Sequence, residues 1–152
     1  PRGDVSENGD LRFFRRTGEG VYDMADLARA TTKLGDFIAT QRARLGAASV
    51  TALGYSNGAN ILASVLFATP ALVDRAVLMH PLIPFTPPPQ PGLANRPLLI
   101  TAGRRDPIGP AAVTQRLVDY LVDQGARVSL VWHEGGHELR PQEITAAADF
   151  LR

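Results

Sequence analysis

The stretch Gly54-Tyr55-Ser56-Asn57-Gly58 lies between a run of strand-forming residues and a run of helix-forming residues. A serine with glycine two residues away on each side is typical of a sharp strand-to-helix turn that exposes the serine hydroxyl. Glycine suits both flanking positions because such a turn leaves little room for a Cβ atom. The pentapeptide alone is a weak signal, since glycine and serine are common residues. Its interpretation therefore depends on residues further along the chain.

Two later apolar runs end in residues that can assist a serine nucleophile. Residues 97–102 form an apolar run that ends at Gly103 and is followed by Asp106. Residues 127–132 form a second apolar run, which is followed by His137. Each polar residue comes just after the carboxyl end of a predicted parallel strand, where open α/β sheets place their chemistry. The order serine, aspartate, histidine along the chain is a known order of a catalytic triad.

The three residue types complement one another chemically. A neutral serine is a poor nucleophile, so it needs a base in contact, and the base needs a carboxylate to orient it. We therefore expect Ser56 to be the nucleophile, His137 the general base and Asp106 the residue that fixes the imidazole tautomer. Asn57 would be the first residue of the next helix, so its backbone N–H is expected to be one donor to an oxyanion.

Each assignment has an alternative. Ser56 could be a structural turn residue, and Asp106 could serve only an Asp-Pro turn. His133 and His80 are the other candidates for the base, although His133 ends a predicted strand and is expected to pack beside Trp132. The spacing of the three histidines matches no metal-ligand motif, so we expect neither a metal nor a cofactor.

The rest of the chain alternates predicted helices with predicted strands, a pattern that means a parallel sheet with crossover helices. Strands are predicted at about 49–54, 75–80, 97–102 and 127–132, and helices at about 22–45, 58–68, 110–124 and from 141 onward. The last helix is expected to turn Ile144, Ala148 and Leu151 inward. Residues 1–20 are interpreted as a polar loop with one aromatic cluster.

Composition restricts the class of protein. The 152 residues fit a single domain, residues 1–152, and 45% hydrophobic with 20% charged residues is ordinary for a globular protein. A net charge of +1 gives no reason to expect nucleic acid as a partner. The absence of cysteine excludes disulfides, thiol catalysis and cysteine zinc sites. No apolar run approaches the roughly 20 residues that span a bilayer, so no integral membrane association is expected.

Together these motifs resemble the phospholipase/carboxylesterase family of α/β-hydrolases, which are compact serine esterases without a large cap domain. The resemblance covers essentially the whole chain and rests on residues 1–3, 12–16, 54–60 and 103–108. It implies an α/β-hydrolase three-layer sandwich with a parallel sheet, and it assigns the triad to Ser56, Asp106 and His137. Four apolar residues are then candidates for substrate binding: Phe13, Phe14, Leu82 and Ile108.

The function we expect is a serine hydrolase that cleaves carboxylic esters of small or medium acyl chain through an acyl-enzyme. A lysophospholipase or a thioesterase with the same triad, and a non-catalytic binding module of the same fold, are the alternatives. The expected partner is a small-molecule ester, and a homodimer is allowed for. We expect a cytoplasmic location, although a signal preceding Pro1 would not be visible in this sequence.

The amino-terminal part departs from the family. Family members begin with further strands and a His-Gly loop that supplies a second oxyanion donor, whereas no histidine precedes Ser56 here. A sheet that began at about residue 49 would also expose a central strand edge, which folded proteins avoid. We therefore expect upstream strands and an oxyanion loop that are not in this sequence. On this interpretation, the 152 residues alone would be slower and less soluble than a longer chain.

Overall fold

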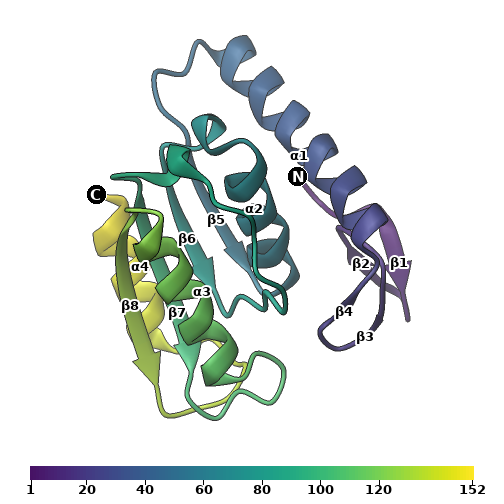
Figure 1. Ribbon diagram of the computed structural model, residues 1–152, viewed down its shortest axis with the longest axis vertical. Coiled ribbons are helices and arrows are strands. Elements are labelled where there is room, and N and C mark those ends of the chain that lie inside the picture. Colours follow the sequence, from purple (N-terminus) through teal and green to yellow (C-terminus); the bar gives the residue numbers. More distant parts are fainter.

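The computed structural model describes residues 1–152, and at its centre lies a four-stranded parallel sheet (Figure 1). Its strands follow one another in chain order: β5 (Thr51–Tyr55), β6 (Arg75–Met79), β7 (Pro97–Gly103) and β8 (Arg127–His133). The register sets Tyr55 beside Met79 and Gly103 beside His133. The carboxyl ends of the strands therefore meet at one edge of the sheet, as the sequence predicts.

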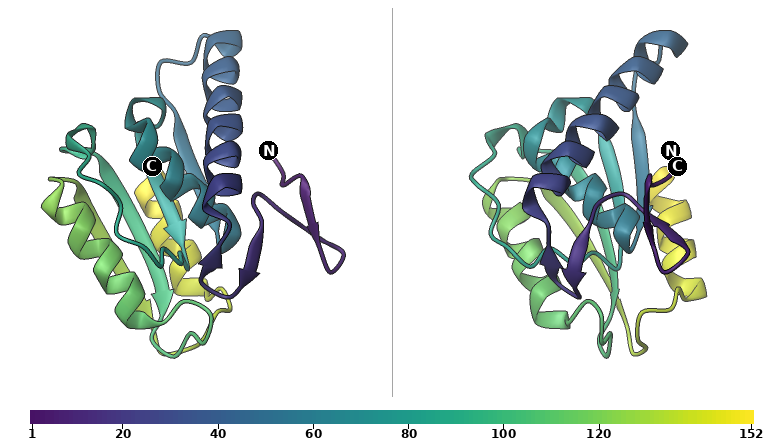
Figure 2. Two further views of the ribbon diagram at one scale, coloured as in Figure 1. Left: turned by 45° about the vertical axis from the view of Figure 1, so that its right-hand side comes forward. Right: turned by 90° about the vertical axis from the view of Figure 1, so that its right-hand side faces the viewer.

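Helices cover both faces of this sheet in three layers (Figure 2). The four helices are α1 (Met24–Leu45), α2 (Asn57–Ala68), α3 (Ala111–Asp123) and α4 (Pro141–Leu151). Helices α2 and α3 share a core with one face, while α4 packs on the other face and α1 packs on the outer side of α2. Two short 3₁₀ helices, Pro70–Leu72 and Pro91–Leu93, lie in the connections. None of the helices is both long enough and apolar enough to cross a bilayer.

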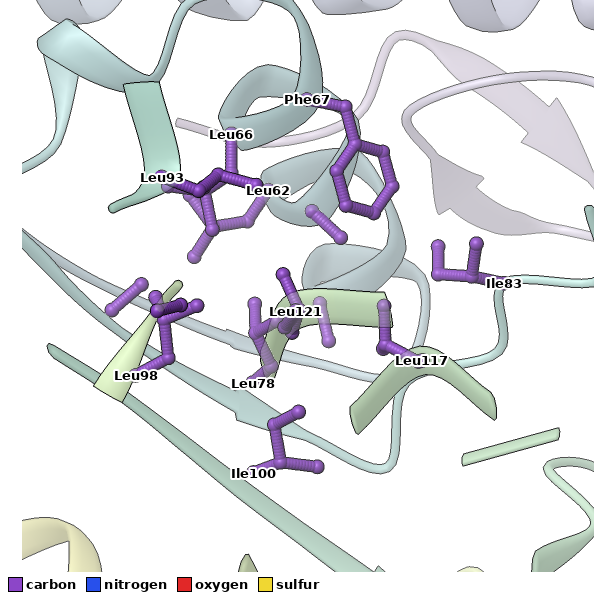
Figure 3. Close-up of a cluster of buried hydrophobic side chains, with 14 of the residues drawn as sticks. Leu62, Leu66, Phe67, Leu78, Ile83, Leu93, Leu98, Ile100, Leu117 and Leu121 are labelled. Carbon is purple, nitrogen blue, oxygen red and sulfur yellow. The ribbon is translucent and has the colours of Figure 1, made fainter. Parts of the chain in front are cut away.

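Helix α2 is buried on nearly all sides because it contacts two separate clusters. Leu62 and Leu66 face the sheet within the main core (Figure 3). Ile61 and Val65 face the other way and pack with Leu27 and its neighbours on α1. A helix that is buried all round has no surface for charged side chains, which explains why α2 carries none.

The amino-terminal segment differs from the expected polar loop, because it contains two short antiparallel hairpins. One pairs β1 (Val5–Glu7) with β2 (Asp10–Arg12), and the other pairs β3 (Arg16–Gly18) with β4 (Val21–Tyr22). Asn8 and Gly9 connect the first pair, both at positive φ. An Asn-Gly pair at positive φ is the preferred two-residue hairpin turn, so this signal was present in the sequence.

The inward face of α4 differs in part from the expected one. Leu151 packs against a core cluster as expected, but the other two residues do not. Ile144 is 53% exposed and Ala148 is exposed, whereas Glu143 and Ala147 are buried. Helix α4 is therefore rotated by about one residue from the apolar pattern, which brings a carboxylate into the core.

Candidate active site

Ser56 lies on a strained turn between β5 and α2. Its φ is +52° and its ψ is −118°, a conformation that L-residues rarely adopt. The Ser56 N–H donates to the Met79 carbonyl at 2.9 Å, and the Ser56 carbonyl accepts from Asn60 N–H at 3.0 Å. These two bonds hold the backbone on both sides of Ser56, so the position of its hydroxyl is fixed by the sheet and by α2.

The structure brings Ser56, His137 and Asp106 together in hydrogen-bonding contact. His137 Nε2 lies 2.9 Å from Ser56 Oγ, and His137 Nδ1 lies 2.7 Å from Asp106 Oδ2. The imidazole thus bridges hydroxyl and carboxylate through its two nitrogens. This geometry allows the ring to accept the serine proton while the carboxylate holds the Nδ1–H tautomer.

Asp106 is oriented by more than His137. Its Oδ1 accepts backbone N–H groups from Ile108 at 2.8 Å and Gly109 at 2.9 Å. Burial alone would raise the pKa of the Asp106 carboxyl, but the donors from Gly109, His80, His137 and Ile108 outweigh burial and lower it. Asp106 is therefore held as a carboxylate.

The loop that carries His137 is tied to the end of β5 and to the loop that follows β7. The Tyr55 hydroxyl donates to the His137 carbonyl at 2.7 Å. Arg105 N–H donates to the Gly135 carbonyl at 3.0 Å. A Cβ on Gly103 would lie 2.0 Å from the Gly136 carbonyl oxygen, so only glycine lets these two loops approach so closely.

The two alternative bases are placed elsewhere. His80 Nδ1 contacts Asp106 Oδ2 at 2.9 Å, and its Nε2 contacts Glu143 at 2.9 Å. His133 Nε2 also contacts Glu143, at 3.2 Å, so His133 belongs to this buried group instead of simply packing beside Trp132 as expected. Of the three histidines, His137 is the one in contact with Ser56 Oγ.

The cluster of His80, His133 and Glu143 has residue types that could hold a metal ion. The Gly135 N–H donates to His133 Nδ1 at 2.9 Å, so that nitrogen is an acceptor and the ring proton lies on Nε2. A protonated Nε2 cannot ligate a metal, and it is this atom that faces Glu143. The hydrogen bonding therefore suits a proton-sharing group better than a metal site.

A cavity of about 140 Å³ opens over Ser56 and His137. Leu82 and Ile108, two of the expected substrate-binding residues, line it. Phe14 does not: it is 0% exposed and packs between α1 and α2, so its assignment to substrate binding is corrected to the core. Phe13 lines a different hollow beside α1 and β5, and its backbone N–H donates to Asn57 Oδ1 at 2.8 Å.

Polar groups form the remaining wall of this cavity. Arg12 and Arg16 come from the hairpins, and Glu7 pairs with both of them at 3.3 Å and 2.9 Å. Tyr22 and Asn60 are hydrogen-bonded to each other at 3.0 Å and also line the cavity. The amino-terminal hairpins thus contribute directly to the surroundings of Ser56, a contribution that the sequence pattern did not reveal.

Asn57 begins α2, immediately after Ser56. The first N–H groups of a helix have no partner within the helix and carry its positive dipole end. The expected assignment of Asn57 N–H as an oxyanion donor stays a prediction, since it concerns a reacting state.

Comparison with known proteins places this chain in a family. The family model described as "Dienelactone hydrolase family" matches residues 16–141. The chain belongs to the dienelactone hydrolase family. MhqD of Bacillus subtilis, whose name gives hydrolase as a provisional function, is 41% identical over 153 residues, which cover 99% of this chain and 76% of MhqD. The chain is therefore a hydrolase, and the expected resemblance to carboxylesterase-type α/β-hydrolases is confirmed.

Solved structures of similar proteins have the same fold as this chain. Atu2452 of Agrobacterium tumefaciens, a protein of unknown function, is 58% identical with a TM-score of 0.92, covering 99% of this chain and 74% of that one. A carboxylesterase of Bacillus cereus is 38% identical with a TM-score of 0.92, covering 98% and 71%. A carboxylesterase of Mesorhizobium loti is 27% identical with a TM-score of 0.90, covering 99% and 72%. The α/β-hydrolase fold of this dienelactone hydrolase family member is thereby confirmed.

Proposed function

We propose that this protein is a serine esterase that hydrolyses carboxylic esters through an acyl-enzyme. The observation that carries the proposal is the double contact of His137, with Ser56 Oγ at 2.9 Å and Asp106 Oδ2 at 2.7 Å. The strained φ of Ser56 supports it, because strain of this kind persists where the surrounding structure enforces it and is common at active sites.

The reaction follows from the order of these contacts. His137 Nε2 takes the hydroxyl proton as Ser56 Oγ attacks the ester carbonyl, and Asp106 stabilises the resulting imidazolium. The carbonyl oxygen becomes an oxyanion, which the N–H of Asn57 stabilises at the start of α2. Collapse of the tetrahedral intermediate breaks the C–O bond, and the imidazolium returns its proton to the leaving alcohol. Water then attacks the acyl-enzyme by the same route and releases the acid and free Ser56.

The substrate class follows from the cavity. Its volume of about 140 Å³ accommodates a short or medium acyl chain, and Leu82 and Ile108 provide apolar contacts for that chain. The two carboxylesterases among the similar structures favour a carboxylic ester over other acyl compounds. We therefore expect aryl or alkyl esters of small acids to be the best substrates.

Hydrolysis of a series of p-nitrophenyl esters from acetate to octanoate tests the proposal. Ser56→Ala should lower kcat by at least about 10⁴-fold, because removal of a triad nucleophile leaves only binding and oxyanion stabilisation. The melting temperature of this variant should match that of the unchanged protein. A Ser56→Ala protein that keeps more than about a tenth of the activity would overturn the assignment.

A further inference from the structure

All three histidines of the chain belong to one hydrogen-bonded series that begins at Ser56. Beyond the triad, Asp106 Oδ2 contacts His80 Nδ1 at 2.9 Å and His80 Nε2 contacts Glu143 Oε1 at 2.9 Å. Glu143 Oε2 then contacts His133 Nε2 at 3.2 Å. The side chains of His80 and Glu143 are both 0% exposed. Two carboxylates, Asp106 and Glu143, are therefore buried on either side of one imidazole.

The hydrogen bonds determine where most of the protons lie. Asp106 accepts from two backbone N–H groups and is a carboxylate, so His80 Nδ1 must be the donor in their contact. Glu143 Oε2 accepts from Arg140 N–H at 2.7 Å and faces the protonated Nε2 of His133. Thr101 Oγ1 donates to Glu143 Oε1 at 2.6 Å. His133 Nε2 also lies 3.4 Å from His80 Nε2, but its contact with Glu143 Oε2 is shorter, so its proton is assigned to Glu143. The contact between His80 Nε2 and Glu143 Oε1 is then left with one unassigned proton.

One proton must occupy that contact. Without it, the nitrogen lone pair would face carboxylate lone pairs at 2.9 Å in a buried site, which is strongly unfavourable. With it, the contact is either an imidazolium–carboxylate pair or a neutral imidazole that accepts from a carboxylic acid. In both forms His80 keeps a proton on Nδ1 and directs it at Asp106. In both forms the group of Asp106, His80 and Glu143 carries a total charge of −1.

We propose that His80 is a positioning residue that holds Asp106 toward His137 through a proton shared with Glu143. The proposal rests on the proposed esterase function, since it concerns how the carboxylate of that triad is held. His80 itself does not exchange a proton with Ser56, because its two nitrogens are engaged by the two carboxylates.

A second donor on Asp106 has a predictable electrostatic effect. Asp106 Oδ2 divides its negative charge between the Nδ1–H groups of His80 and His137. If His80 were removed, the full charge would act on His137 and stabilise its imidazolium form. A base that stays protonated to higher pH shifts the acid limb of the kcat/KM profile to higher pH. Loss of the proton shared with Glu143 would add negative charge nearby and act in the same direction.

Other charged or titratable groups around His80 leave this sign unchanged. The rings of Tyr55 and His137 have centroids 5.8 Å and 5.1 Å from that of His80, and His133 lies at 5.3 Å. Arg12 and Arg16 share the cavity wall with His80, but both are paired with Glu7. These groups are present in the unchanged protein and in every His80 variant alike.

Two substitutions separate the contacts of His80. In His80→Asn, the amide nitrogen takes the place of Nδ1 and can still donate to Asp106. In His80→Gln, the amide takes the place of Nε2, so the contact with Glu143 is kept and the contact with Asp106 is lost. His80 has a φ of +51°, a region where asparagine is well tolerated, so His80→Asn is also compatible with the local backbone.

The test compares pH profiles of ester hydrolysis for these variants. We expect His80→Gln to lower kcat by about tenfold to a hundredfold, the effect of one lost hydrogen bond to a charged group. We also expect KM to be nearly unchanged and the acid limb of kcat/KM to move to higher pH. His80→Asn should restore most of kcat and should shift the acid limb less than His80→Gln does, because it keeps the donor to Asp106. The proposal would be overturned if the two variants had the same pH profile of kcat/KM and the acid limb of both lay where it lies in the unchanged protein. This holds even if both variants have a lower melting temperature.

A spectroscopic measurement keeps the test independent of turnover and of variant folding. The protein has three histidines, so its nitrogen-15 NMR spectrum should show the signals of only three imidazole rings. We expect His133 with its proton on Nε2, and His80 with a hydrogen-bonded proton on Nδ1. An unprotonated Nδ1 in His80 would overturn the proposal. A protein that hydrolysed no ester and whose Ser56 did not react with a fluorophosphonate would rule out the esterase function, and with it the role of His80 in catalysis. The proton positions on His80 and His133 would still be decided by NMR.

Discussion

Gly54 passes the backbone of Gly58 so closely that a Cβ on Gly54 would lie 2.4 Å from the Gly58 carbonyl oxygen. A Cβ on Gly58, by contrast, would meet no atom within 4 Å apart from those of its chain neighbours and its own helix backbone. The two glycines of the Gly-x-Ser-x-Gly pattern are thus not equivalent. The close approach leaves no space for a side chain at Gly54. At Gly58 there is space for a side chain, so only the position of its backbone matters for the turn.

This asymmetry predicts opposite outcomes for two matched substitutions. Gly54→Ala should destabilise the fold by about 1–3 kcal/mol through overpacking. Because it displaces Ser56, it should also lower kcat at least about a hundredfold. Gly58→Ala should leave kcat unchanged and should raise stability by up to about 1 kcal/mol, since alanine is the better helix former. Denaturant unfolding and ester hydrolysis measure both effects, and comparable losses from the two substitutions would contradict this description of the turn.

The hydrogen bond from Tyr55 to the His137 carbonyl predicts a second effect on activity. Tyr55→Phe removes one neutral hydrogen bond, so kcat/KM should fall by about two- to twelvefold as the His137 loop loosens. Tyr120→Phe is the control, because the Tyr120 hydroxyl also donates to a loop carbonyl, that of Pro88, at the same distance of 2.7 Å. Equal activities of the two variants would mean that Tyr55 does not position His137.

The start of α1 predicts a dependence of stability on pH. The Arg29 guanidinium, 2.7 Å from Asp26 Oδ1, is the main group that lowers the pKa of the Asp26 carboxyl from 3.8 to about 2. A lowered pKa in the folded state stabilises the protein above pH 3.8, and this contribution is lost as the pH falls toward 2.

Asp26→Asn should therefore be less stable than the unchanged protein at about pH 6, and the difference should shrink between about pH 4 and pH 2 as wild-type Asp26 becomes protonated. Urea unfolding at a series of pH values measures the difference. Asp36→Asn, an exposed substitution on the same helix, is the control and should show no such trend. A difference for Asp26→Asn that is the same at every pH would show that the ion pair is not its cause.

The sequence predicted the sheet because its four strands are short runs rich in apolar residues, each followed by a turn. The same rule located Ser56, Asp106 and His137, since residues that follow parallel strands meet at one edge. It could also have indicated His80 and His133, because both stand where a predicted strand ends. It could not indicate Glu143, because an apolar pattern assigns a glutamate on a helix to the solvent side.

The wrong prediction of which face of α4 points inward has a physical explanation. Glu143 can be buried because Thr101, Arg140, His80 and His133 satisfy both of its oxygens. Such satisfaction depends on partners from several other segments, so it cannot be inferred from the helix alone. Phe14 is a comparable case: two adjacent phenylalanines give no sign of which one enters the core until α1 and α2 are packed.

We expect Ser56 to be a nucleophile that is activated by His137. The most direct measurement is the mass of the protein after reaction with a fluorophosphonate, followed by peptide mapping of the adduct. We predict one adduct per chain, on the peptide that contains Ser56, and its absence in Ser56→Ala. Labelling should also become much slower in His137→Ala but not in Thr114→Val, a buried substitution on α3 away from the site. An unlabelled protein, or an adduct on another residue, would contradict the account.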